Sequence, residues 1–544
     1  MRLKKLLYAG AAATVMVAGL GSCKKSAFDI NKNPNNATDS TVSYDVILPA
    51  ALHSTGTLVR NQWGFLQNWM GYWARSGTYA PNVIEETYQI PTTFGNGIWN
   101  TAYDNNYDYQ IMEIKAKQAG ATMYEGIARI MKAHNFGILV DVYGNVPYSE
   151  ALKGNANPTP AYDKGEDIYK DLLKQLDTAV TLIQNSIQVT NKNILENDIM
   201  FGTPNNSAAT FTTQKAKWVK FANTVRLRLL VHLMNGGVNT PQGTIAGFDI
   251  PGEIADIIAN GGGFLGTGED ATVNPGYKSD KPNPFYTTFK TTSTGAQAAN
   301  NVYYRANKWG IDYYSYNGDP RISRVYEAGS NGYVGVEYGL PPVNENASPN
   351  LAGIGPGVYR SATASNPILT SAESYFLQAE ARYRGFLTTS TAATLLNTGI
   401  AESFTFLGAT GSATYITGNT GYGDVDINAA SLSPTNPNIP GGGIFTIISQ
   451  KWFALNGLDP LEVWNDYRRV DMKNSAGVDV GHFIYGAAVG YDPGPPISVS
   501  PQNTSTLIPV RMLYPQTEYN YNPTNVGAEG TINAFTSRVF WDIK

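Results

Sequence analysis

Cysteine is the scarcest residue type of this 544-residue chain, which has one, Cys23. A chain with a single thiol cannot build a disulfide framework. Charge is also scarce: Asp, Glu, Lys and Arg make up 15% of the residues, with a formal net charge of −4, against about 25% charged residues in an average globular protein. The chain therefore has no basic surface for nucleic acid, and we expect a largely neutral, polar surface.

Histidine is rare too, and the usual motifs of zinc and serine hydrolases are missing. The four histidines are far apart in sequence, at His53, His134, His232 and His482. His134 and His232 fall in helical patterns, and we expect both to be structural. Residues 261–266 fit the glycine pattern of a dinucleotide loop, but an expected helix over 253–259 stands where such a site needs a strand. No calcium-loop motif occurs. We predict no metal, no cofactor and no catalytic residue, so the chain is not expected to be an enzyme.

Long apolar runs are limited to the N-terminus, where basic residues precede the stretch from Leu6 to Leu20. This stretch is shorter than the roughly 20 apolar residues that span a bilayer, and it is typical of a secretory signal. It ends in Leu20-Gly21-Ser22-Cys23, which resembles a bacterial lipobox. We predict a signal peptide over 1–22 and acylation of Cys23, with palmitate among the chains, which would anchor the protein to a membrane. An ordinary cleavage site with a chance cysteine is the alternative.

The remaining chain divides into a polar, Asn-rich tether over 23–40 and a single body over 41–544. In the body, apolar residues recur at helical spacing behind expected N-caps. Thr122 with Glu125 and Asp163 with Glu166 are expected to begin helices, and so is Thr370 with Glu373, whose helix should stop at Gly385. Further helices are expected around 218–233, 444–455 and 461–467.

Tracts rich in Gly, Pro, Asn and Tyr separate these helices, chiefly over 260–365, 405–442 and 472–530. They are too long to be simple connections, since structureless loops beyond about 12 to 15 residues usually carry function. The helices occur in pairs, which suits a tetratricopeptide-like array. We therefore predict a mainly α fold, in which a tetratricopeptide-like scaffold of helical pairs carries a large irregular, loop-rich face and few short strands.

Several motifs, weak singly, follow one another in a specific order along nearly the whole mature chain. They are Phe28 to Asn35, Asp141 to Ala151, Trp218 to Asn223, Arg226 to Arg228, Asp319 to Arg321, Ser371 to Gly385, Gln450 to Trp452, Glu462 to Arg469 and Arg511 to Pro515. In this order the motifs resemble the SusD/RagB-like nutrient-binding outer-membrane lipoproteins.

The resemblance implies a lipid-anchored protein on the extracellular side of the outer membrane. Such a protein captures an oligosaccharide or, in some branches, a peptide, and acts as a lid over a SusC-like TonB-dependent transporter. Two alternatives remain open. A lipid-anchored glycosidase would need two carboxylates about 5 to 9.5 Å apart, which the sequence cannot show. A structural surface protein would bind no nutrient.

Aromatic residues are plentiful, with 34 Tyr, 20 Phe and 9 Trp. Trp73, Tyr79 and Tyr88 fall in an irregular polar stretch that also contains Arg75. Flat rings stack on the C–H faces of sugars, while guanidinium and amide groups bond the hydroxyls. The ligand residues of the resembled family also come from the loop after its first helices. These four residues are our predicted ligand site.

Packing of the same rings beneath the loop is the alternative to ligand binding, and the site would then move elsewhere, to Tyr303 and Tyr304. Arg468 and Arg469, beside Asp466 and Glu462, are expected to form an ion-pair network.

Overall fold

The structure is a computed structural model that describes residues 42–205, 207–234, 243–433, 436–470 and 495–543. The predicted signal peptide over 1–22, the tether over 23–40 and the lipidation site Cys23 lie outside these residues. Tyr44–Lys544 forms one compact unit.

Helices provide the framework. The long helices are α2 (Tyr44–Asn61), α5 (Asn96–Ala119), α6 (Thr122–Tyr143), α7 (Gly165–Gln184), α9 (Ala208–His232), α10 (Ile250–Ala259), α16 (Ser371–Tyr383), α17 (Ala392–Leu407), α19 (Gly443–Leu455) and α20 (Pro460–Arg469). The short helices are α3 (Gly64–Trp69), α4 (Val83–Glu86), α8 (Ile194–Asn197), α11 (Pro284–Phe289), α12 (Ala299–Tyr303), α13 (Lys308–Tyr316), α14 (Ile322–Val325), α15 (Pro356–Tyr359), α18 (Ser412–Gly418), α21 (Gln516–Tyr521) and α22 (Pro523–Ala528).

The strands of the described residues form two-stranded antiparallel pairs. The pairs are β1 (Trp73–Arg75) with β5 (Tyr304–Ala306), β2 (Val146–Pro147) with β3 (Tyr162–Asp163), β4 (Ala271–Val273) with β8 (Asn366–Leu369), β6 (Tyr326–Glu327) with β7 (Gly353–Ile354), and β9 (Ser431–Ser433) with β10 (Asn436–Pro440). Each pair ties together segments of loop.

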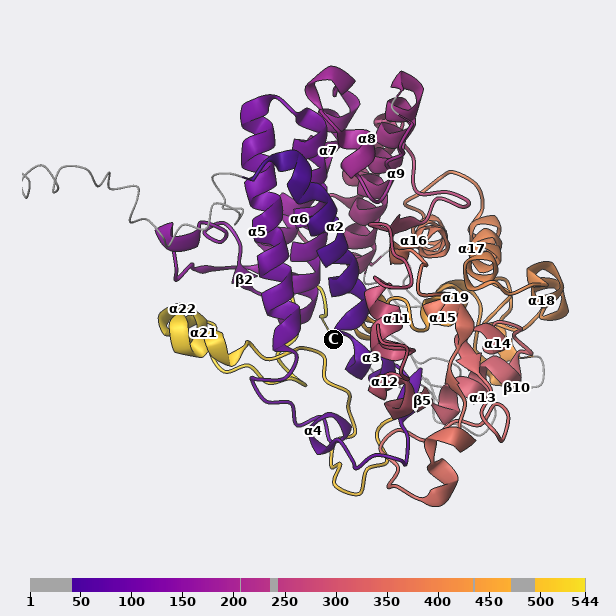
Figure 1. Cartoon of the computed structure of the whole chain (residues 1–544). Coiled ribbons are helices and arrows are strands. Elements are labelled where there is room, and N and C mark those ends of the chain that lie inside the picture. Colours follow the sequence, from indigo (N-terminus) through magenta and orange to yellow (C-terminus); the bar gives the residue numbers. More distant parts are fainter. Residues whose placement is uncertain (1–41, 206, 235–242, 434–435, 471–494, 544) are drawn as a thin grey trace, which may run out of the picture. The chain divides into compact units, whose positions relative to one another are not determined.

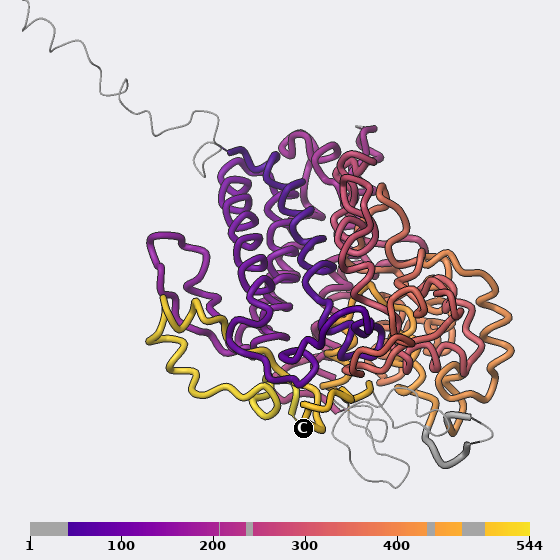
Figure 2. Tube along the Cα trace, turned by 60° about the horizontal axis from the view of Figure 1, so that its bottom comes forward, coloured from indigo at the N-terminus to yellow at the C-terminus, as the bar shows by residue number. Residues whose placement is uncertain are grey.

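Helices α2, α5, α6, α7 and α9 stand side by side, and α16 packs on α17 and α19 (Figure 1). Neighbours in sequence such as α5 and α6 lie against each other, so the predicted mainly α scaffold of tetratricopeptide-like pairs is confirmed. Short elements, among them α4, α12 and β5, gather beyond the end of α2, and Figure 2 brings this end forward. We call residues 73–95, 284–306 and 326–360 the loop face.

The first residues of the helices show which of the expected N-caps form. Thr370 caps α16 as predicted, because its hydroxyl accepts a hydrogen bond from the Glu373 amide at 3.2 Å. The capping box predicted at Thr122 is wrong: Thr122 is already helical, and the Met123 amide donates instead to Asn191 Oδ1 at 2.9 Å.

Asp163 is also not a helix cap. It lies in β3, and its carboxylate accepts hydrogen bonds from the amides of Tyr148 at 3.0 Å and Ser149 at 2.9 Å. The local sequence around Asp163 predicts an N-cap, but its carboxylate instead bonds the amides of a turn 14 to 15 residues earlier in sequence. The glycine-rich stretch at 261–266 follows α10, so a helix precedes it as predicted.

A buried network of charges joins helices from different pairs. Arg469 of α20 donates to Glu380 of α16 at 2.6 Å and to Asp466 at 2.7 Å. Lys451 of α19 donates to Glu462 at 2.6 Å and lies 3.1 Å from the other oxygen of the Asp466 carboxylate. All five side chains are at most 2% exposed. The predicted ion-pair network is confirmed for Arg469.

Arg468 differs from the prediction. Its guanidinium donates to the carbonyl oxygens of Asp141 at 2.8 Å and Val510 at 2.9 Å, and it lies 3.6 Å from the centre of the Trp464 ring. Neutral oxygens and a ring face make these direct contacts with the buried cation, and the charges of Asp542 and Asp141 oppose the lowering of its pKa by burial.

Replacing Arg469 with Met should lower the free energy of unfolding by about 3 to 5 kcal/mol, because it leaves Glu380 and Asp466 buried with one cationic partner fewer. Lys170→Met is the matched control, since the Lys170–Glu166 pair is 43% and 42% exposed and such pairs contribute about 1 kcal/mol or less. Urea unfolding of the chain lacking residues 1–23 measures both. Equal midpoints for the two variants would contradict the prediction.

Candidate ligand-binding site

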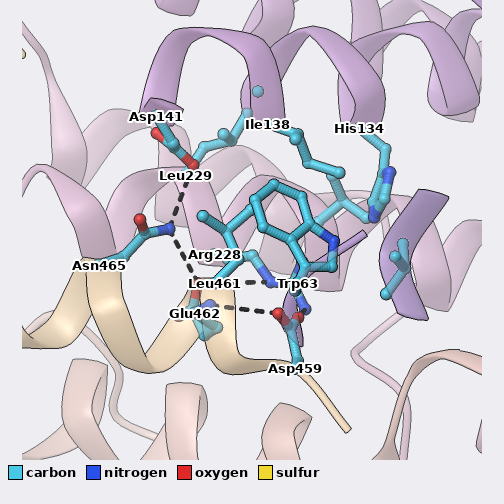
Figure 3. Close-up of a pocket in the computed structure, with 13 residues that line it drawn as sticks. Trp63, His134, Ile138, Asp141, Arg228, Leu229, Asp459, Leu461, Glu462 and Asn465 are labelled. Carbon is cyan, nitrogen blue, oxygen red and sulfur yellow. Dashed lines mark hydrogen bonds and ion pairs between the residues drawn. The ribbon is translucent and has the colours of Figure 1, made fainter. Parts of the chain in front are cut away.

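The first cavity to consider lies among the long helices, between α6, α9 and α20 (Figure 3). It has a volume of about 20 Å³, and about 10 to 15 Å³ is enough for one water molecule. Its charged groups bond to one another: Arg228 lies 3.3 Å from Asp459, and the Asn465 amide donates to Asp141 at 3.3 Å. The cavity is thus a water-sized gap in the core and offers no room for a nutrient.

Both histidines that were predicted to be structural lie beside the charged groups of this cavity. His134 contacts the Asn135 side chain at 3.1 Å, and burial lowers its pKa to about 4. His232 lies 2.9 Å from Glu462. Burial alone would lower the pKa of His232, but the carboxylates of Glu462 and Asp141 raise it to about 9. Both side chains are buried within the helical core.

The loop face brings the two sets of aromatic candidates together. Strand β1 pairs with β5, so that Trp73 lies opposite Ala306 and Arg75 opposite Tyr304. The Ser76 amide then donates to the carbonyl oxygen of Tyr303 at 2.8 Å. The predicted stretch around residues 73–79 and the alternative stretch around 303–304 therefore form one site.

A row of rings runs from the surface inward at this place. The ring centres of Tyr79 and Tyr303 are 5.3 Å apart in an edge-to-face arrangement, and those of Tyr303 and Tyr304 are 4.8 Å apart. Tyr304 in turn lies 5.4 Å from Trp73. Tyr79, Tyr303 and Tyr304 are half-buried, whereas Trp73 is 1% exposed. The outer rings are accessible, and Trp73 supports them from below.

Arg75 lies beneath the loop, 2% exposed. Its Nε atom donates to Glu86 at 2.6 Å, and its Nη atoms donate to the carbonyl oxygens of Tyr79 at 2.8 Å and Leu340 at 2.9 Å. The guanidinium thus fixes the backbone at Tyr79.

Tyr88 also lies in the interior, 1% exposed, with its hydroxyl accepting a hydrogen bond from the Ser498 amide at 2.9 Å. Its ring packs against Trp69, with the ring centres 5.7 Å apart. Of the four predicted ligand residues, Tyr79 reaches the surface, and Trp73, Arg75 and Tyr88 lie under it.

Helix α4, between Tyr79 and Tyr88, has an inverted pattern of burial. Val83 and Ile84 are 42% and 46% exposed, while Glu85 and Glu86 are 5% and 1% exposed. Glu85 accepts a hydrogen bond from the Asn68 side chain at 2.5 Å. Burial raises the pKa of the Glu85 carboxyl to about 7, although the Asn68 hydrogen bond opposes the shift. An acid thus lies under the loop that carries Tyr79.

An open cavity of about 300 Å³ adjoins the ring row. Asn301 of α12 and Arg305 of β5 line it, together with Lys290 and Glu327. The sequence did not indicate this cavity, because its charged residues come from separate irregular segments and share no spacing.

The comparison with protein families decides the identity. A family model described as starch-binding associating with outer membrane, SusD-like, matches residues 34–478. This chain belongs to the SusD-like family. The resemblance predicted from the motifs is thereby confirmed.

Solved structures share the fold of this SusD-like chain. A chitin-binding SusD homolog from Flavobacterium johnsoniae is 22% identical, with 91% of this chain and 98% of the other covered and a TM-score of 0.67. A SusD homolog from Bacteroides uniformis is 21% identical, with 92% and 99% covered and a TM-score of 0.64. No curated protein sequence matches the chain.

Two features do not occur in the described residues of this SusD-like chain. Within these ranges no helix has both the length and the apolar character needed to cross a bilayer. Nor do the described residues contain a group of three or more His, Cys, Asp or Glu side chains arranged to hold a metal ion.

Glu85→Gln should change how stability depends on pH. The folded state holds the Glu85 proton up to about pH 7, against a usual pKa of 4.5. The stability due to this proton is therefore complete below pH 4.5 and is lost as pH rises to 7. Gln cannot ionise, so the variant should lack this loss, which amounts to at most about 3 kcal/mol.

Urea unfolding at several pH values between 4.5 and 8 tests this. Glu166→Gln, a change of an exposed acid in the first turn of α7, is the control and should keep the pH profile of the parent. Parallel profiles for the parent and Glu85→Gln would show that Glu85 titrates normally.

Proposed function

We propose that this SusD-like protein captures an oligosaccharide on the Tyr79–Tyr303 ring pair and delivers it to a SusC-like TonB-dependent transporter of the outer membrane. The observation that carries the proposal is the half-buried ring pair on the loop face, in a chain of a family described as starch-binding and associating with the outer membrane.

The ring pair suits a sugar because it is held in place before any ligand arrives. Arg75 bonds the carbonyl of Tyr79, and Thr78 accepts a hydrogen bond from the Ser348 amide at 2.8 Å. A Cβ atom at Gly77 would lie 2.8 Å from the side chain of Asn346, so the loop approaches its neighbour too closely for any other residue. A rigid loop loses little conformational entropy on binding, and its rings are free to stack on C–H faces.

An oligosaccharide is the better candidate than a peptide. The Flavobacterium johnsoniae relative is a chitin-binding protein, and aromatic rings beside a few polar groups are typical of sites that stack on sugars. We infer that binding occurs without catalysis, since the family is described by binding. Release of sugar from any bound glycan by the purified protein would contradict this inference.

The anchor and the partner complete the proposal. A lipid at Cys23, followed by the Asn-rich tether over 23–40, would hold the body at the outer surface of the membrane and let it hinge over a transporter.

Replacing Tyr79 or Tyr303 with Ala should weaken glycan binding about ten-fold each, through loss of about 1.4 kcal/mol of stacking. Both rings are half-buried, and the backbone beneath them is held by other bonds, at Tyr79 by Arg75 and at Tyr303 by the Ser76 amide, so the melting temperature should change little. A glycan array that includes chitin oligosaccharides, followed by calorimetry on the best ligand, measures the effect.

Tyr521→Ala is the matched control, because Tyr521 is 76% exposed and lies at the end of α21, outside the loop face. It should bind like the parent. Undiminished affinity in a stable Tyr79→Ala/Tyr303→Ala double variant would remove the ring pair from the proposal.

Cys23→Ala should abolish palmitate labelling and release the protein from the membrane, because no acyl chain can then be attached. With Cys23 intact, the protein should copurify in mild detergent with a TonB-dependent transporter through an interface above about 1,000 Å². Labelling that persists in the variant would refute the anchor, and repeated purification of the intact protein alone would refute the partner.

A further inference from the structure

The open cavity beside the ring pair contains a buried cation of unusual surroundings. Arg305 is 7% exposed. Its Nε atom donates to the Ser348 carbonyl oxygen at 2.9 Å, and its Nη atoms donate to the Ser348 hydroxyl and to the carbonyl oxygens of Asn301 and Tyr304. Every one of these acceptors is neutral. Among the described residues, no carboxylate forms an ion pair with Arg305.

Other buried arginines of the chain are compensated differently. Arg321 donates to the Asp319 carboxylate at 2.6 Å. Arg60, which bonds a carbonyl oxygen, lies 3.9 Å from the centre of the Phe285 ring. Arg305 has neither a carboxylate nor a ring, and burial lowers its pKa, against the opposing charges of Glu327 and Tyr79. A desolvated cation of this kind favours an anion as its missing partner.

The charges of the other two charged residues that line the cavity cancel each other. Lys290 donates to Glu327 at 2.7 Å, and the same carboxylate oxygen accepts from the Tyr359 hydroxyl at 3.0 Å. The charge of Arg305 is therefore left over, and the cavity as a whole is cationic. The Lys290 ammonium is on the rim, 27% exposed, where it could contact a bound anion as well.

The wall over Arg305 is open because of a glycine. A Cβ atom on Gly353 of β7 would lie 3.1 Å from Arg305 Nη1. Gly353 does not have the left-handed backbone that would require glycine. Its missing side chain thus leaves space against the guanidinium.

The cavity and the ring pair share their supports. Asn301, which lines the cavity, and Tyr303 both belong to α12. Ser348, another lining residue, bonds Thr78 directly before Tyr79. The cavity and the ring pair are therefore built on the same short segments.

We propose that this cavity binds the carboxylate of an acidic sugar, so that the glycan captured by the ring pair contains a uronic acid residue. The inference rests on the proposed function. Lys290 and the second N–H of Arg305 Nη2 hold the carboxylate by charge-assisted hydrogen bonds, since both N–H groups of Nη1 donate to Asn301 and Tyr304. The neutral side chains of Gln297, Asn301 and Ser330 face the hydroxyl groups of the sugar.

Binding of matched glycan pairs tests the proposal. The probes are tetrasaccharides of galacturonate, glucuronate and mannuronate, each beside its methyl ester, in which one methyl group per residue replaces the charge. Calorimetry with the chain lacking residues 1–23 should give at least one uronate that binds ten-fold or more tightly than its ester. Weaker or equal binding of every uronate would overturn the inference.

Variants then locate the anion. Gly353→Ala, which covers the guanidinium, and Lys290→Gln should each lower the affinity for the uronate about ten-fold and leave that for the ester unchanged. Gly527→Ala is the control, since a Cβ atom there meets nothing within 4 Å and its backbone is not left-handed. Arg305 itself is left intact, because its four hydrogen bonds also hold the loop.

The outcomes separate the two proposals. Neutral glycans that bind through Tyr79 and Tyr303 without any preference for uronates would leave the proposed function and remove the anion site. Absence of all glycan binding would remove both. A preference for sulfated over uronate glycans would overturn the assignment of a carboxylate.

Discussion

Burial of Arg469 between Glu380 of α16 and Asp466 of α20 is the contact on which the rest of the structure depends. Lys451 extends it to α19. Helix α19 then reaches the segment directly before the loop face: the indole of Trp452 donates to the Met70 carbonyl oxygen at 3.0 Å, and the Tyr72 hydroxyl donates to the Trp452 carbonyl oxygen at 2.6 Å. Since β1 begins at the next residue, the charged core of the scaffold also sets the position of the ring row.

The sequence predicted features that depend on near neighbours. The cap at Thr370 was predictable because its hydroxyl and the amide of Glu373 lie within one turn. The caps predicted at Thr122 and Asp163 are wrong because of residues outside the local turn. Asn191 accepts from the amide at the start of α6, and the turn at Tyr148 donates to the Asp163 carboxylate. The family was predictable because the order of its motifs is preserved along the chain.

The ligand site was only partly predictable for the same reason. The sequence indicated aromatic rings near residue 79, but whether a ring faces solvent depends on contacts with a segment more than 200 residues later. Strand β1 pairs with β5, and the Tyr79 hydroxyl donates to the carbonyl oxygen of Ala299 in α12. Trp73 and Tyr88 therefore lie inside and Tyr79 outside. Arg305 gave no signal, because an arginine without a carboxylate partner is recognised only from its surroundings in space.

The close approach of Gly77 to Asn346 has an evolutionary consequence. The path of the loop is fixed by backbone atoms and by a residue that cannot acquire a side chain, so changes there would damage binding and folding together. The outer rings bond to this frame less tightly: the Tyr79 hydroxyl donates to the Ala299 carbonyl oxygen at 3.4 Å, and the Tyr79 and Tyr303 rings pack on each other. Relatives that bind a different nutrient are thus expected to differ at the ring positions and to keep the residues of the frame.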